Sequence, residues 1–126
     1  METKWTQLWL EYKKSKDKKN TGLVKTVSIK GFDEGNRVLA SGLHELRTGI
    51  SAMLGISVSI GAEAETGVQI IKVQSMQPES YRITGKEQGV LIEASDEKGA
   101  LYGIFHMLRV IAMEKPLQEI SVTCEP

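Results

Sequence analysis

The stretch DEKGALYGIFHMLR, residues 96–109, carries the clearest structural signal in this chain. Its apolar residues recur at steps of three and four, which places them on one stripe of an α-helix; they are Leu101, Ile104, Phe105 and Leu108, followed by Ile111. Asp96 is a suitable N-cap because its carboxylate can accept backbone N–H groups, and Pro116 prevents the helix from continuing. Gly103 costs about 1 kcal/mol relative to alanine in a helix interior. We therefore expect another backbone to approach it closely, as in a helix laid tightly on a sheet.

A second, longer helix is predicted over residues 33–54. Its apolar stripe has the same helical spacing; it consists of Leu39, Leu43, Leu46, Ile50, Met53 and Leu54. Gly55 followed by Ile56 has the pattern of a left-handed C-terminal cap with its closing hydrophobic residue. The helix is thus expected to end at this glycine.

Seven strands are predicted from alternating and β-branched runs around these helices. They cover residues 7–12, 23–29, 56–60, 68–73, 80–85, 89–94 and 119–123, and residues 13–20 are predicted as a solvated loop. Several connections are too short for a parallel crossover, so the sheet should be mixed or mostly antiparallel. Each helix has one apolar stripe, and both can cover the same face. We predict a single α+β domain over residues 1–126, a two-layer sandwich with two helices packed on one face of the sheet.

The composition excludes several classes of protein. The chain has 126 residues, 16 basic and 16 acidic, with a formal net charge of zero, which argues against a dedicated nucleic-acid binder. The sequence contains no run of eighteen apolar residues, so no membrane span is predicted. The first residues lack the features of a secretory signal, which leaves the cytoplasm and the periplasm both open as compartments. Cys124 is the single cysteine, so no intramolecular disulfide can form, and a structural thiol is favoured over a nucleophile.

No motif for chemistry stands out in the sequence. His44 and His106 do not have metal-ligand spacing, and no paired carboxylates, nucleophile elbow or nucleotide-binding loop is evident. We therefore expect no catalytic, cofactor-binding or metal-binding residue in this chain. Aromatic side chains near the N-terminus could stack on sugar rings; these are Trp5, Trp9 and Tyr12. Burial in the core or against a neighbouring domain is favoured over that sugar contact.

The letters of the C-terminal third carry a resemblance to a known family. They comprise a strand that begins at Tyr81, then Gly99, then LYGIFHMLR at residues 101–109, and the closing EISVTCEP. Together with LWLEY at residues 8–12, they resemble the N-terminal domain of the bacterial and fungal α-glucuronidases of glycoside hydrolase family 67. The accessory N-terminal domains of β-N-acetylhexosaminidases share this α+β fold and are the rival resemblance. Their related helix is rich in glutamine, which this one lacks, and that favours the glucuronidase.

The resemblance implies a non-catalytic accessory domain cut before a (β/α)8 catalytic barrel of the same polypeptide. The full enzyme would remove α-1,2-linked (4-O-methyl-)glucuronic acid from xylo-oligosaccharides in xylan degradation by an inverting mechanism. It would need no cofactor and could dimerise through its other domains, whereas this domain would support the barrel and be inactive alone. Tyr102, His106 and Arg109 share the helix face away from the apolar stripe, so we consider them for a polar seam with the barrel; ordinary exposure is the alternative. Two alternatives to this function stay open: the chain could be the accessory domain of a β-N-acetylhexosaminidase-like glycosidase, or a free-standing carbohydrate-binding module.

Overall fold

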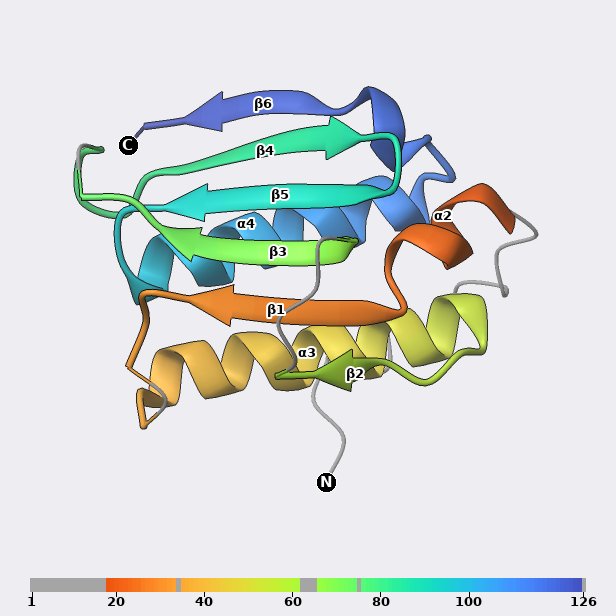
Figure 1. Cartoon of the computed structure of the whole chain (residues 1–126), viewed down its shortest axis with the longest axis horizontal. Helices are drawn as coiled ribbons and strands as arrows, with labels where there is room; N and C mark the ends of the chain where they lie inside the picture. Colours follow the sequence, from red (N-terminus) through yellow and green to blue (C-terminus); the bar gives the residue numbers. More distant parts are fainter. Residues whose placement is uncertain (1–17, 34, 62–65, 75, 126) are drawn as a thin grey trace.

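A computed structural model of the chain describes residues 18–33, 35–61, 66–74 and 76–125. Its elements, in chain order, are α2 (Lys18–Leu23), β1 (Thr26–Lys30), α3 (Arg37–Leu54), β2 (Ser59–Ile60), β3 (Gly67–Lys72), β4 (Tyr81–Lys86), β5 (Gly89–Ala94), α4 (Glu97–Ala112), the 3-10 helix η1 (Leu117–Glu119) and β6 (Ser121–Cys124). Figure 1 shows two layers, with α3 and α4 side by side behind one sheet. The predicted α+β two-layer architecture is confirmed.

The sheet has six strands in the order β2-β1-β3-β5-β4-β6. β1 pairs in parallel with both β2 and β3, and β3 pairs in parallel with β5. β4 is antiparallel to both of its neighbours, β5 and β6. The sheet is therefore mixed, which was one of the two predicted forms. The predicted hairpin at residues 80–94 is confirmed as β4 and β5, which pair from Tyr81↔Ala94 to Lys86↔Gly89.

The segment before β1 differs from its prediction. Residues 18–23 form α2, where the sequence predicted the end of a loop and the start of a strand. Asn20 holds this helix in place: its side chain is 1% exposed, donates to the carbonyl of Lys115 at 2.9 Å and accepts from the backbone N–H of Leu117 at 2.9 Å. The loop prediction fails here because these partners are far away in the sequence. The strand predicted at residues 7–12 lies outside the described residues.

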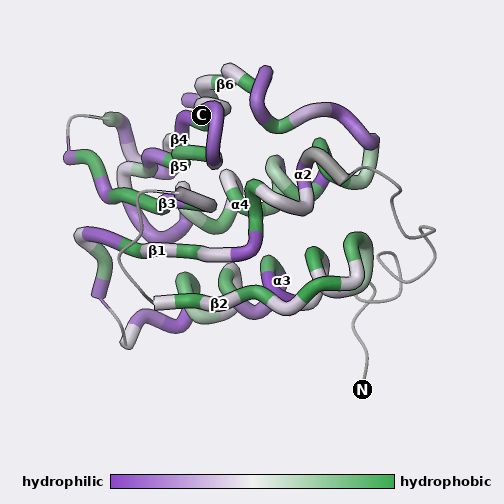
Figure 2. Tube along the Cα trace, turned by 45° about the vertical axis from the view of Figure 1, so that its right-hand side comes forward, coloured by the Kyte–Doolittle hydropathy of each residue, from purple (hydrophilic) through white to green (hydrophobic). Residues whose placement is uncertain are grey.

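Local signals place the ends of α3. Asn36 is the N-cap, and its side chain accepts from the backbone N–H groups of Val38 and Leu39, so the helix begins at Arg37 and not at residue 33. Gly55 has φ 69 and closes the helix in the left-handed conformation, as predicted. In Figure 2 hydrophobic and hydrophilic residues alternate along α3, as expected of a helix with one buried stripe.

The core lies between the sheet and the two long helices. Its fully buried members come from both layers, among them Val27, Val68, Ile70, Ile83 and Ile92 of the strands and Leu46, Ile50, Ile104 and Leu108 of the helices. Two glycines let α4 approach the sheet. A Cβ at Gly103 would lie 2.9 Å from Cγ2 of Ile92, and a Cβ at Gly99 would collide with the carbonyl oxygen of Ser80. The tight packing of α4 is thus confirmed, but the close backbone lies at Gly99, one turn before the predicted glycine.

Candidate functional site

The outward side of α4 and its C-cap carry four residues at steps of four, three and four, which we call the α4 stripe: Tyr102, His106, Arg109 and the cap residue Met113. Tyr102 is 43% exposed and Met113 is 53% exposed, and these are the large hydrophobic side chains that lie exposed among the described residues. Arg109 is exposed and His106 is half-buried. The structure therefore places the three predicted seam residues on one stripe. It adds Met113, which the sequence prediction missed, although its step of four from Arg109 could have indicated it.

His106 connects the α4 stripe to the sheet. Its Nδ1 lies 2.9 Å from the hydroxyl oxygen of Tyr81 on β4, and the two rings meet edge to face at 76° with centroids 5.8 Å apart. Tyr81 is 8% exposed, so the contact is made at the margin of the core. The ring of His106 therefore turns toward the sheet, and its part in a seam with a catalytic domain stays a prediction.

Burial governs the ionisation of this pair. Desolvation raises the pKa of Tyr81, and the neighbouring Cys124 acts in the same direction. Desolvation also lowers the pKa of His106, and the positive charge of Arg109 adds to the effect. At neutral pH both rings are therefore uncharged. A neutral phenol and a neutral imidazole that share a hydrogen bond fix the position of α4 against β4.

The start of α4 is fixed as well. Asp96 is its N-cap, as predicted: Oδ1 accepts from the backbone N–H of Gly99 at 2.8 Å. The other oxygen, Oδ2, accepts from the backbone N–H of Glu79 at 3.0 Å, which ties the cap to the segment before β4. The α4 stripe is thus presented on a helix held at its first turn and at its middle.

The remaining candidate residues lie away from the α4 stripe or outside the described residues. Trp5, Trp9 and Tyr12, the candidates for a sugar contact, lie outside the described residues. Within the described part of the chain, no group of three histidine, cysteine or acidic side chains is placed to hold a metal ion. Cys124 is an exposed free thiol on β6, opposite Tyr81 in the strand register. None of the helices in the described ranges has the length and hydropathy needed to cross a membrane.

Comparison with known sequences identifies one family. The sequence model of the family described as glycosyl hydrolase family 20, domain 2, matches residues 13–122. No curated protein matches the chain significantly.

Solved structures with a similar fold are parts of much longer enzymes. An enzyme of glycoside hydrolase family 138 that targets pectin rhamnogalacturonan II matches 80% of this chain with a TM-score of 0.60 and 14% identity. A chitobiase from Flavobacterium johnsoniae matches 71% with a TM-score of 0.52 and 19% identity. An N-acetyl-β-hexosaminidase from Streptomyces plicatus matches 71% with a TM-score of 0.45 and 20% identity. The chain spans 11%, 15% and 16% of these three proteins, respectively.

The assignment to the α-glucuronidases is therefore wrong, and with it the inverting removal of glucuronic acid from xylan fragments. The family match is to glycosyl hydrolase family 20, the family of the rival resemblance. The physical reason for the error lies in α4. The residues from Leu101 to Arg109 that carried the resemblance include the buried stripe and Gly103, which packs against Ile92. A helix laid on a sheet requires such residues, so they report the fold and not the substrate of the parent enzyme.

Proposed function

Because the chain belongs to the glycosyl hydrolase family 20, domain 2 family, we propose that it is the accessory domain of a larger β-N-acetylhexosaminidase-like glycoside hydrolase. The small share that it spans of the two enzymes matched with TM-scores of 0.60 and 0.52, 11% and 15%, supports this proposal. The catalytic carboxylates would belong to another domain of the same polypeptide. In this proposal residues 1–126 form one N-terminal domain that precedes a catalytic barrel and supports it without taking part in the reaction.

The α4 stripe is the proposed contact with the catalytic domain. The observation that carries this proposal is the exposure of Tyr102 and Met113 at the two ends of the stripe, with Arg109 between them. Aromatic residues, methionine and arginine are the side chains enriched in the centres of protein interfaces. His106 and its bond to Tyr81 make the surface rigid, which reduces the entropy lost on docking.

The fold similarities favour support over substrate selection. The two structures that match with TM-scores of 0.60 and 0.52 are enzymes of different glycoside hydrolase classes. A domain that accompanies different catalytic activities is better suited to hold a catalytic domain in position than to choose its substrate.

An activity assay tests the accessory role. The 126-residue chain and the polypeptide that contains it would both be incubated with 4-nitrophenyl N-acetyl-β-glucosaminide. We expect nitrophenol release from the longer polypeptide and none from the chain alone. Turnover by the chain alone would overturn the accessory role, and an inactive longer polypeptide would overturn the hexosaminidase-like activity.

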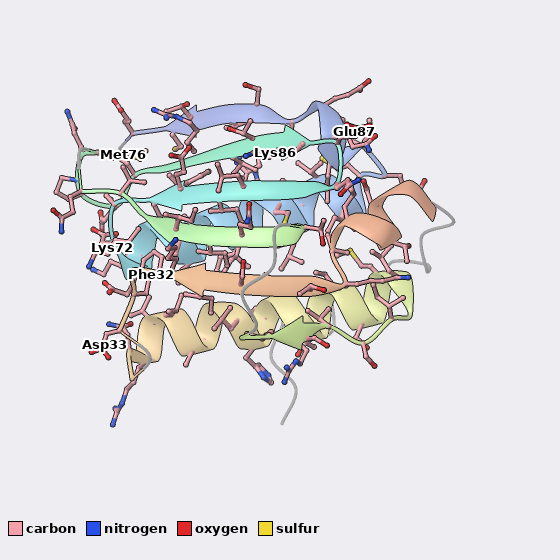
Figure 3. The ribbon with its side chains drawn as sticks, viewed as in Figure 1. Phe32, Asp33, Lys72, Met76, Lys86 and Glu87 are labelled. Carbon is pink, nitrogen blue, oxygen red and sulfur yellow. The ribbon has the colours of Figure 1, made fainter. Side chains whose placement is uncertain are left out.

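A separate experiment tests the contact surface. Tyr102→Ser combined with Met113→Ser should lower the Tm of the longer polypeptide more than that of the 126-residue chain, because only the former buries these side chains. Lys86→Ser, at the exposed last residue of β4 (labelled in Figure 3), is the control and should change both proteins equally. Equal losses for the double variant would reject the α4 stripe as the contact and leave the accessory role standing.

A further inference from the structure

The two long helices approach each other closely at Gly42 of α3. A Cβ added at Gly42 would lie 3.1 Å from Cδ1 of Ile104 and 3.2 Å from Cδ1 of Leu101, both on α4. Figure 1 shows the same arrangement, with α3 and α4 side by side behind the sheet. Gly42 therefore marks the line along which α3 faces α4.

Glu45 lies beside this line, on the side away from the sheet. Successive residues of an α-helix are turned by about 100°, so Leu46 and Glu45 lie on opposite sides of Gly42, about 40° and about 60° away. Leu46 is fully buried in the core between the helices and the sheet. Glu45 is half-buried, and it therefore borders the outer surface of the helix pair where α3 meets α4.

One oxygen of the Glu45 carboxylate is buried without a partner. Oε2 has no hydrogen-bond partner among the described residues. The ion pairs of the described residues all involve other carboxylates: Lys72 with Glu97, Arg82 with Glu93 and Lys98 with Glu79. A buried carboxylate oxygen without a donor is unfavourable, because it has lost its water and gained no bond in exchange. A donor from outside the chain would remove this penalty.

The surface around Glu45 is continuous with the α4 stripe. Leu101, Phe105 and Arg109 follow one another at steps of four, so they form a row on α4 that begins beside Gly42 and ends in the α4 stripe. Leu101 and Phe105 are half-buried, and Arg109 is exposed. A domain that covers the α4 stripe needs to extend only across this row to reach Glu45.

We propose that the contact with the catalytic domain extends across this row onto α3, and that Glu45 receives an arginine or lysine side chain of that domain. This inference rests on the proposed accessory role. A cationic side chain has the matching charge, and its N–H groups would supply the donor that Oε2 lacks. Burial in the contact makes such a pair stronger than an ion pair on an open surface. The pair would also fix where the two domains meet, since a misplaced contact would leave both charges unpaired.

Glu45→Gln tests this pairing, because it removes the charge and keeps the shape of the side chain. In the 126-residue chain, where Oε2 has no partner, we expect Tm to stay the same or to rise. In the longer polypeptide we expect Tm to fall by about 2 °C or more, since a favourable pair is lost there. Glu87→Gln is the control, the same change at an exposed residue of the β4–β5 turn that Figure 3 labels, and should alter neither protein.

Two outcomes would overturn the proposal. A lower Tm of the 126-residue chain would mean that Glu45 has its partner within the chain. An unchanged or higher Tm of the longer polypeptide would mean that no cation reaches Glu45. The variant Tyr102→Ser with Met113→Ser separates this failure from a failure of the proposed function. If it still lowers the Tm of the longer polypeptide selectively, the α4 stripe remains the contact and only its extension onto α3 is rejected.

Thiol labelling measures independently whether α3 is covered. In a Cys124→Ser background, Ser41→Cys places a thiol at an exposed position four residues before Glu45, on the same side of α3. Lys86→Cys, on β4, is the control. We expect a maleimide to react with Ser41→Cys several-fold more slowly in the longer polypeptide than in the 126-residue chain, and with Lys86→Cys at the same rate in both. Mass spectrometry of the labelled peptide gives the rates. Equal rates for Ser41→Cys in the two proteins, or equal slowing at both positions, would overturn the extension onto α3.

Discussion

The hydroxyl oxygen of Tyr81 lies 2.9 Å from Nδ1 of His106, and this bond joins the antiparallel side of the sheet to the outward side of α4. The two residues are 25 positions apart. Their contact is possible because Gly103, one turn before His106, lets the helix settle against Ile92 and the base of Tyr81. A packing requirement of the core thus determines the geometry of the surface that α4 presents.

Tyr81→Phe should lower the free energy of unfolding by about 1 kcal/mol, because it removes the hydroxyl that pairs with the half-buried imidazole. The measurement is urea denaturation followed by circular dichroism. Tyr102→Phe is the matched control, since it removes a hydroxyl from an exposed tyrosine and should have little effect. Equal losses in the two variants would show that the bond to His106 contributes nothing.

The stability of the protein should depend on pH through His106. Its pKa in the folded protein lies below the ordinary value of about 6.5, so the unfolded chain binds a proton first as the pH falls. Stability should therefore decrease as the pH falls below about 6.5, until the folded protein is protonated as well. Thermal unfolding of the unaltered chain and of His106→Gln, measured between about pH 7.5 and about pH 4.5, checks this. The variant should lose less stability in the upper part of the range, and an identical pH profile would contradict the assignment.

Asn20→Ala should destabilise the protein by about 2 kcal/mol or more, because it leaves the carbonyl of Lys115 and the N–H of Leu117 without their buried partner. Gln118→Ala is the control. Its side chain donates to the carbonyl of Glu87 at 2.8 Å in an exposed position, where water can replace it. Chemical denaturation of both variants gives the comparison, and similar losses would mean that Asn20 does not hold α2 to the segment after α4.

Substituting two glycines with alanine should have opposite effects. Gly103→Ala places a methyl group 2.9 Å from Cγ2 of the buried Ile92, and overpacking of this kind costs about 1–3 kcal/mol. At Gly22 in α2 nothing lies within 4 Å of an added Cβ, so Gly22→Ala should stabilise the helix by up to about 1 kcal/mol. Thermal unfolding should lower Tm for the first variant and raise it for the second. A gain at Gly103 would contradict the tight packing of α4 on the sheet.

A local sequence motif in this domain does not identify the parent enzyme, as the incorrect resemblance to the α-glucuronidases shows. Leu101 to Arg109 was the most specific stretch, yet its distinguishing residues serve the packing of α4 on β5 and β4. Such residues are required by any parent enzyme that uses the fold. The family was therefore identified by a match over residues 13–122 and not by any local motif.

Local interactions determined the two long helices, the caps at Asp96 and Gly55 and the β4–β5 hairpin, because their partners belong to the same helix turn or to adjacent strands joined by a short turn. Only the tertiary structure decided the parallel pairing of β1, β2 and β3, the helix held by Asn20, and the contact of His106 with Tyr81. The bonds that hold α2 span 95 and 97 positions, and the local sequence prefers a loop there. A short stretch records its own backbone preferences and its buried face, but it does not record which distant surface will cover that face.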